Sequence, residues 1–251
     1  MMEKLSNLAK NPKRSFLFYG DSGVGKTVLA TSFPGPVRVF DFDCKLSSAA
    51  DFYSDKKELL GAIDFTQYPQ PKKGEKRIFT KFAEDLNKLA EEGSKYRTIV
   101  FDSLTALCEM VMEEEMILRP GKADRDSMAG VEVANIKDYQ VVITYIKHLL
   151  KKLLSLECEY LIITAHVVTE KDENTGILKS NLQVFGKDLP NWIPKMFEEV
   201  YFMYSKLEAG KPQRFVQTQA DLKHVARSQM KKMPPSLNVT AGFKEIEKCF
   251  S

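Results

Sequence analysis

The sequence is short of the residues that hold metal clusters and disulfide frameworks. It has four cysteines with no CxxC spacing, and only three histidines, among 251 residues. This argues against a structural zinc site and a disulfide-stabilised fold, and it favours a reducing compartment. No apolar run approaches the 18 residues of a membrane-spanning helix, and the first residues lack the apolar core of a signal peptide. We therefore expect a cytoplasmic protein with no membrane partner.

Neither sign of charge dominates the composition. The chain carries 37 basic and 34 acidic residues, a formal net charge of +3. Composition alone therefore does not indicate a nucleic-acid partner, and any basic surface must be local. With 43% hydrophobic residues the chain can bury one substantial core. We expect a single domain over residues 1–251, with its core at about residues 13–235.

The most informative motif is the octapeptide GDSGVGKT at residues 20–27, which fits the phosphate-binding loop pattern GxxxxGK[ST]. A short apolar strand pattern precedes it and a helical pattern follows, as the motif requires. The glycines let backbone N–H groups wrap closely around an anion, and the start of the helix adds a positive dipole end. We expect a nucleoside triphosphate, with the Lys26 amine on the β- and γ-phosphates and the Thr27 hydroxyl on Mg²⁺. The residues expected to line this loop are Gly20, Asp21, Ser22, Gly23, Val24, Gly25, Lys26 and Thr27.

Alternating strand and helix patterns indicate the fold class. Apolar β-type runs recur at residues 15–19, 37–42, 98–102, 160–165 and 198–204, and helical patterns lie at 78–92 and 136–156. They predict an α/β fold with a mainly parallel sheet covered on both faces. Three segments, 66–77, 119–135 and 167–190, are expected to be a polar turn and two irregular loops. Residues 206–232 carry seven basic against two acidic residues, in what we expect to be a C-terminal β extension.

Nucleotide chemistry also needs a metal-orienting carboxylate and a group that activates water. Asp102 ends the strand pattern at 98–102 and is expected to hold Mg²⁺ through water. The less favoured alternative is that it caps the following helix, and the two roles can coexist. Asp41 and Asp43 close the second strand pattern, and either can act as the general base. His166 ends the fourth strand pattern, where a histidine is either structural or a sensor of the γ-phosphate.

Taken in order, the segments GDSGVGKT, VFDFDCKLS, TIVFDSLT, LIITAH and FGKDLPNWIPKMFEEVYFM resemble the core of RecA-type recombinases. The resemblance covers about residues 13–235 and is strongest to the short phage proteins described as Sak-type single-strand annealing ATPases. It implies ATP hydrolysis with Mg²⁺, and it places Asp43 where RecA-like proteins carry a catalytic glutamate. The shorter side chain implies slow hydrolysis. The resemblance also sets the fourth strand between those of the phosphate loop and Asp102, which favours the sensor role for His166.

The same resemblance implies partners. It makes the loops 119–135 and 167–187 DNA-facing, and it sets Arg227 in a region whose basic residues reach a neighbour's γ-phosphate. Such a finger is expected from a neighbour because the chain's own phosphate loop lacks a nearby candidate arginine finger and the basic cluster lies far along the sequence. Single-stranded DNA, further copies of the chain in a ring or filament, and a single-strand-binding protein are the expected partners. The candidate DNA contacts are Arg119, Lys122, Arg125, Lys179 and Lys187.

The charges of these loops alone do not predict DNA binding. Residues 119–138 hold four basic and four acidic side chains, and residues 167–189 hold three basic and four acidic ones. We expect an ATP-dependent protein that binds single-stranded DNA and acts in recombination or strand annealing, encoded by a phage and working in the host bacterial cytoplasm. The alternative is a nucleotide-gated interaction protein, such as a helicase loader or a regulatory switch. A small-molecule kinase is less favoured, because neither loop is an arginine-rich lid.

Overall fold

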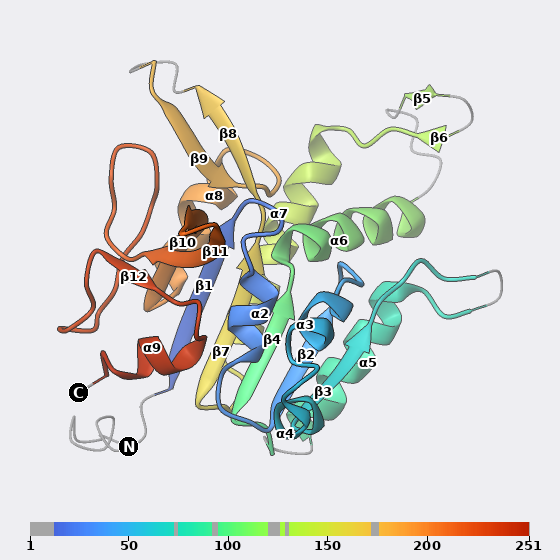
Figure 1. The fold of residues 1–251 in the computed structure, drawn as a ribbon. Helices are drawn as coiled ribbons and strands as arrows, with labels where there is room; N and C mark the ends of the chain where they lie inside the picture. Colours follow the sequence, from blue (N-terminus) through green and yellow to red (C-terminus); the bar gives the residue numbers. More distant parts are fainter. Residues whose placement is uncertain are drawn as a thin grey trace, which may run out of the picture.

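The computed structural model describes residues 13–72, 75–91, 95–119, 126–128, 131–171 and 176–250. Its centre is an eight-stranded sheet in the order β12-β11-β10-β1-β7-β4-β2-β3 (Figure 1). Neighbouring strands from β10 to β3 are parallel, and β11 and β12 continue the sheet in antiparallel fashion. The predicted α/β class is therefore confirmed, together with the C-terminal β extension.

The strands lie close to the positions that the apolar runs predict. The runs correspond to β1 (Arg14–Gly20), β2 (Val37–Asp41), β4 (Thr98–Asp102), β7 (Tyr160–Ala165) and β10 (Glu199–Glu208). The C-terminal extension consists of β11 (Lys211–Gln217) and β12 (Ser236–Asn238). As expected, β7 lies between β1 and β4. Because these strands are parallel, the residues after each of them meet at one edge of the sheet.

Alternation along the buried strands divides the core into two layers. In β1, Phe16 and Phe18 face one layer, and Leu17 and Tyr19 face the other. The first layer includes residues of α2 (Lys26–Thr31), α3 (Ser47–Phe52) and α9 (Phe243–Glu247), with α4 (Lys57–Gly61) beside it. The second layer includes residues of α5 (Ile78–Glu91), α6 (Leu104–Leu118), α7 (Ile136–Leu154) and α8 (Asp188–Trp192), which runs into a 3-10 turn at Ile193–Met196. Helices thus cover both faces of the sheet, as the sequence predicts.

Side-chain caps set the starts of helices α6 and α7. The Ser103 hydroxyl caps α6 by accepting a hydrogen bond from the backbone N–H of Ala106. The capping alternative for Asp102 is therefore wrong, because the next residue fills that position. Asn135 and Asp138 form a reciprocal capping box at the start of α7. The carboxylate of Asp102 is left for the site.

Three segments differ from the sequence-based expectation. The polar turn at 66–77 overlaps an edge strand, β3 (Ile63–Gln67), whose side chains are half-buried or exposed and so give no apolar run. The irregular stretch 167–190 contains a hairpin of β8 (Val167–Lys171) and β9 (Leu178–Leu182), which extends beyond the sheet (Figure 1). The loop 119–135 contains a short antiparallel ladder of β5 (Ser127–Met128) and β6 (Val131–Glu132). In the β8–β9 hairpin every side chain except Leu182 is half-buried or exposed, so the hairpin lacks the continuous buried apolar face on which strand prediction depends.

No helix in the described ranges is both long enough and apolar enough to cross a membrane.

Candidate nucleotide-binding site

The phosphate loop leaves β1 where the sheet is tightly packed. A Cβ atom on Gly20 would lie 2.3 Å from the carbonyl oxygen of Met203 on the neighbouring strand, so a side chain is excluded there. Gly25 has a φ of 93°, which is the left-handed region that glycine adopts without strain. These two glycines fix where the loop starts and how it turns into α2.

The Lys26 amine is folded back onto its own loop. Its Nζ donates to the carbonyl oxygens of Gly20 at 2.9 Å and Asp21 at 2.8 Å, and lies 3.4 Å from Nδ1 of His166. The side chain is 6% exposed. Burial lowers the pKa of Lys26 to about 8, and the charges of Asp102 and Asp43 offset this only in part. The site therefore contains a desolvated cation that an anionic ligand would stabilise.

Hydroxyl groups hold the Asp102 carboxylate in place. Thr27 Oγ1 donates to one carboxylate oxygen at 2.5 Å, and Thr164 Oγ1 donates to the other. Burial raises the pKa of Asp102; these two hydrogen bonds oppose the shift, while the charges of Asp43 and Asp41 add to it. Within the described residues no cluster of three or more acidic, histidine or cysteine side chains forms a metal cage. One hydroxyl and one carboxylate nevertheless fit Mg²⁺, which takes few protein oxygens and completes its shell with water and substrate phosphate.

The structure separates the roles of the two aspartates that sequence left open. Asp41 is buried and accepts hydrogen bonds from the backbone N–H groups of Lys45 at 3.3 Å and Leu46 at 3.1 Å, and from Nε2 of Gln67 at 2.8 Å. Its carboxylate is thus occupied in shaping the turn after β2. Asp43 lies beyond the end of β2 and lines the same cavity as Lys26.

Asp43 is held in its ionised form. Burial acts to raise its pKa, but hydrogen bonds from His166 and Ser103, together with the charge of Lys45, bring the pKa below its ordinary value. A carboxylate that stays ionised and faces the phosphate cavity has the protonation state that a general base requires.

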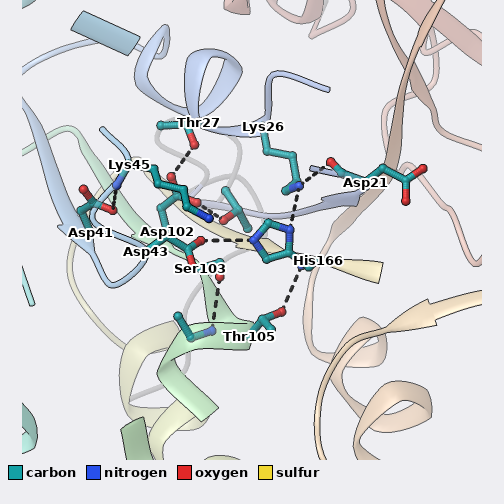
Figure 2. Close-up of polar contacts among 12 residues, drawn as sticks. Asp21, Lys26, Thr27, Asp41, Asp43, Lys45, Asp102, Ser103, Thr105 and His166 are labelled. Carbon is teal, nitrogen blue, oxygen red and sulfur yellow. Dashed lines mark hydrogen bonds and ion pairs between the residues drawn. The ribbon is translucent and has the colours of Figure 1, made fainter. Parts of the chain in front are cut away.

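His166 connects the two charged groups. Its Nε2 lies 3.3 Å from Oδ2 of Asp43, while Nδ1 faces Lys26 (Figure 2). A protonated lysine can only donate, so Nδ1 accepts from Lys26, and Nε2 carries the proton that is donated to Asp43. The backbone of His166 is also tied on both sides: its N–H donates to Thr105 Oγ1 at 3.1 Å, and its carbonyl accepts from Gln183 N–H at 2.9 Å.

The site also contains residues that the sequence did not single out. A cavity of about 420 Å³ is lined by the phosphate loop, Asp43, Asp102 and His166, and in addition by Lys45, Phe52 and Arg214. Lys45 comes soon after the aspartate pair, and this position was a signal that could have been used. The sequence gives no such signal for Arg214, because this residue is far from Thr27 along the chain. Only the sheet extension brings it close to the phosphate loop. The expectation that the chain has no arginine near its own phosphate loop is therefore wrong.

The other candidate residues that the structure describes lie outside this cavity. The Arg227 guanidinium donates to the backbone carbonyls of Lys195, at 3.3 Å, and Phe197, so its role as a finger for a neighbour stays a prediction. Arg119 directly follows α6 as its C-cap and forms an ion pair with Glu115 at 3.2 Å. Lys187 is exposed at the start of α8. Lys179 lies opposite Glu170 in the β8–β9 hairpin. Lys122 and Arg125 lie outside the described residues.

Comparison with known proteins agrees with a phosphate-loop nucleotide-binding protein. The chain belongs to the AAA domain family, whose sequence profile matches residues 12–230. The flagellar accessory protein FlaH from Methanocaldococcus jannaschii is similar at 14% identity, with a TM-score of 0.41 over 90% of this chain and 84% of that chain. A KaiC-like protein from Pyrococcus horikoshii is similar at 12% identity, with a TM-score of 0.45 over 90% of this chain and 84% of that chain. No curated protein matches the chain.

The Lys26 pKa predicts how triphosphate affinity depends on pH. The phosphates favour the protonated amine, whose pKa is about 8 without nucleotide. ATP affinity should be constant up to about pH 8 and then fall by up to roughly tenfold per pH unit. Titrations from pH 7 to 10 measure this. The control is Lys26→Arg, because the guanidinium stays charged over this range. Its ATP affinity should be weaker than that of the wild type but should not fall as the pH rises. An equally flat profile for the wild type would contradict the assignment.

The two aspartates predict opposite effects of the same substitution. Asp43→Asn should slow ATP hydrolysis by roughly two or more orders of magnitude, the usual contribution of a positioned base, while leaving stability nearly unchanged. Asp41→Asn should lower the free energy of unfolding by about 1–3 kcal/mol, because buried backbone N–H groups lose a charged acceptor. Single-turnover kinetics and urea unfolding measure the two. Slow chemistry in Asp41→Asn together with normal chemistry in Asp43→Asn would reverse the assignment.

Proposed function

We propose that this protein hydrolyses ATP and uses the nucleotide to control binding to single-stranded DNA during recombination or strand annealing. The observation that carries the first part is the row Lys26, His166 and Asp43, which joins the phosphate-binding lysine to an ionised carboxylate through one imidazole. Thr27 and Asp102 lie in the same cavity and would supply hard oxygen ligands for Mg²⁺.

The residues suggest a division of labour in hydrolysis. The loop N–H groups and Lys26 hold the phosphates. Asp43 orients water and accepts its proton as the bond from water oxygen to the γ-phosphorus forms and the bond from that phosphorus to the β–γ bridging oxygen breaks, which releases ADP and phosphate. Thr27 and Asp102 would hold Mg²⁺, and the ion would supply positive charge against the phosphate oxygens. His166 keeps Asp43 in place through its Nε2–H donor. Because Lys26 contacts Nδ1 of the same ring, a γ-phosphate that draws the amine away also changes the hydrogen bonding of His166.

The connection to DNA rests on the β8–β9 hairpin, which comes directly after His166 in the chain. β8 begins at the next residue, and the His166 carbonyl is bonded to Gln183 just after β9. A movement of His166 would therefore also displace the base of the hairpin. Lys179 lies on that hairpin and Lys187 shortly after it, so nucleotide state and phosphate contacts can be coupled through a short, hydrogen-bonded path.

A second candidate is a nucleotide-gated protein that binds another protein. The hairpin presents Val168, 38% exposed, and Leu178, 54% exposed, and exposed apolar side chains favour a protein surface. Under this alternative the same His166 path acts on a protein partner. The two candidates share the ATPase site and differ only in what the hairpin contacts.

The ATPase part is tested by two substitutions in the cavity. Lys26→Ala should abolish ATP binding or turnover with the fold intact, because the glycines set the shape of the loop. Asp102→Asn should still bind nucleotide but lose most Mg²⁺-dependent turnover, because the lost charge matters more as phosphoryl charge develops. Phosphate release and equilibrium nucleotide binding measure the two effects. Wild-type turnover in Lys26→Ala would refute the proposed site.

The DNA part is tested by oligonucleotide binding with and without ATP. Affinity should be higher with ATP and should fall steeply with salt, with a log-log slope of about −0.7 per phosphate neutralised. Reversing the charges of Arg119, Lys122 and Lys179 together should weaken binding without changing DNA-free ATP affinity. The matched control reverses Lys57, Lys151 and Lys244, exposed lysines on α4, α7 and α9. Absent or salt-independent binding by the wild type would favour the protein-partner alternative.

A further inference from the structure

Arg214 reaches the phosphate loop from the antiparallel extension of the sheet. It lies on β11, two strands away from β1. A Cβ atom built on Gly25 would lie 2.5 Å from both Cδ and Nε of Arg214. The arginine side chain thus lies against the backbone of the residue before Lys26. Glycine at position 25 is needed for this contact as well as for its φ angle.

The position of Arg214 is fixed by its backbone and by an aromatic ring. Its backbone N–H donates to Thr240 Oγ1 at 2.8 Å, and its carbonyl accepts from Val239 N–H at 2.8 Å. Its guanidinium carbon lies 4.7 Å from the centroid of the Phe52 ring. Phe52 ends α3 and is 41% exposed. This stack is at the rim of the nucleotide cavity and not in the core, so packing alone does not account for it.

The charges of the cavity leave room for an anion. Its wall carries the cations Lys26, Lys45 and Arg214 and the carboxylates Asp43 and Asp102. The carboxylates are already engaged by His166 and by hydroxyl groups. Within the described ranges the Arg214 guanidinium has no ion pair with a carboxylate. A planar guanidinium with free donors, held beside a phosphate-binding loop, is suited to phosphate oxygens.

We propose that Arg214 binds the phosphates of the nucleotide in cis, with Phe52 holding the guanidinium in position. This inference deepens the proposed ATPase function and rests on it. It means that the positive charge around the phosphates is completed within one chain. An arginine from a neighbouring subunit is then not required to bind the phosphates.

The test compares nucleotide affinity in variants of the full-length protein. Arg214→Ala should weaken binding of a fluorescent ATP analogue by roughly ten- to a hundredfold, as expected for loss of a charge-assisted hydrogen bond. Arg214→Lys should recover part of this loss, since it keeps the charge without the planar fork. The matched control Lys211→Ala, an exposed residue on the same strand, should bind like the wild type. Thermal unfolding of each variant shows that it is folded; if Arg214→Ala is not, Arg214→Gln replaces it.

Inorganic tripolyphosphate, used as a competitor, separates phosphate contact from base contact. If Arg214 holds phosphates, Arg214→Ala should weaken the binding of tripolyphosphate and the binding of the ATP analogue by similar factors. Weaker binding of the ATP analogue alone would mean that the arginine contacts the base or the ribose, and this result would overturn the proposal. Unchanged affinity for both would overturn it too. If the wild type binds neither ligand, the ATPase proposal itself fails, and the two failures are therefore distinguishable.

Mixing two impaired variants, at an ATP concentration too low to saturate Arg214→Ala, separates action in cis from action in trans. Arg214→Ala protein has an intact phosphate loop, and Lys26→Ala protein has an intact arginine. If Arg214 acts on its own loop, the mixture should hydrolyse ATP no faster than the two proteins measured separately. Recovery of activity on mixing would show that Arg214 serves a neighbouring chain, which would overturn the proposal.

Discussion

The site depends on one buried positive charge. Lys26 is held at the crossing of the phosphate loop and the parallel strands, where burial works against its charge. Two backbone carbonyls stabilise the amine, and the carboxylates of Asp43 and Asp102 help at longer range. None of these is a full counter-ion in direct contact, so the amine is poised for an anion that brings its own negative charge. This partial compensation explains why the neighbouring groups are arranged around it.

The parallel sheet makes that arrangement possible. β1, β2, β4 and β7 end at one edge, so the residues after each strand come together although they lie far apart in the sequence. β7 lies between β1 and β4, which brings His166 beside Lys26 and close to Asp43. Had β7 been at the edge of the sheet, the imidazole could not have bridged them. The strand order is thus a condition for the chemistry.

The extension beyond β10 adds to the site from the other side. β11 pairs with β10 in antiparallel fashion and carries Arg214 across to Gly25. The sequence shows the segment 206–232 only as a basic stretch. In the structure its basic residues differ in role: Arg214 lines the cavity, whereas Arg227 is bonded to backbone carbonyls near Phe197. Two arginines in the same basic stretch therefore have different surroundings, because one lies against the phosphate loop and the other contacts the turn before β10.

The sequence by itself determined the strands, the long helices and the phosphate loop. These depend on local patterns: runs of apolar residues, helical periodicity, and glycines at fixed spacing. It also brought Asp102 and His166 forward, because both end strongly apolar strands. It did not find β3 or the β8–β9 hairpin, whose side chains are largely exposed and whose pairing partners are what make them strands.

Only the tertiary structure decided which aspartate faces the cavity. The sequence left either Asp41 or Asp43 as the general base. In the structure, the Asp41 carboxylate accepts hydrogen bonds from backbone N–H groups in the turn, whereas the Asp43 carboxylate lies beside His166. Likewise, only the sheet brought Arg214 to Gly25 and Phe52. Local patterns fix where the chain is regular, because they act over a few residues. Which charged groups share one low-dielectric cavity is decided by contacts between distant segments, and these exist only once the sheet has formed.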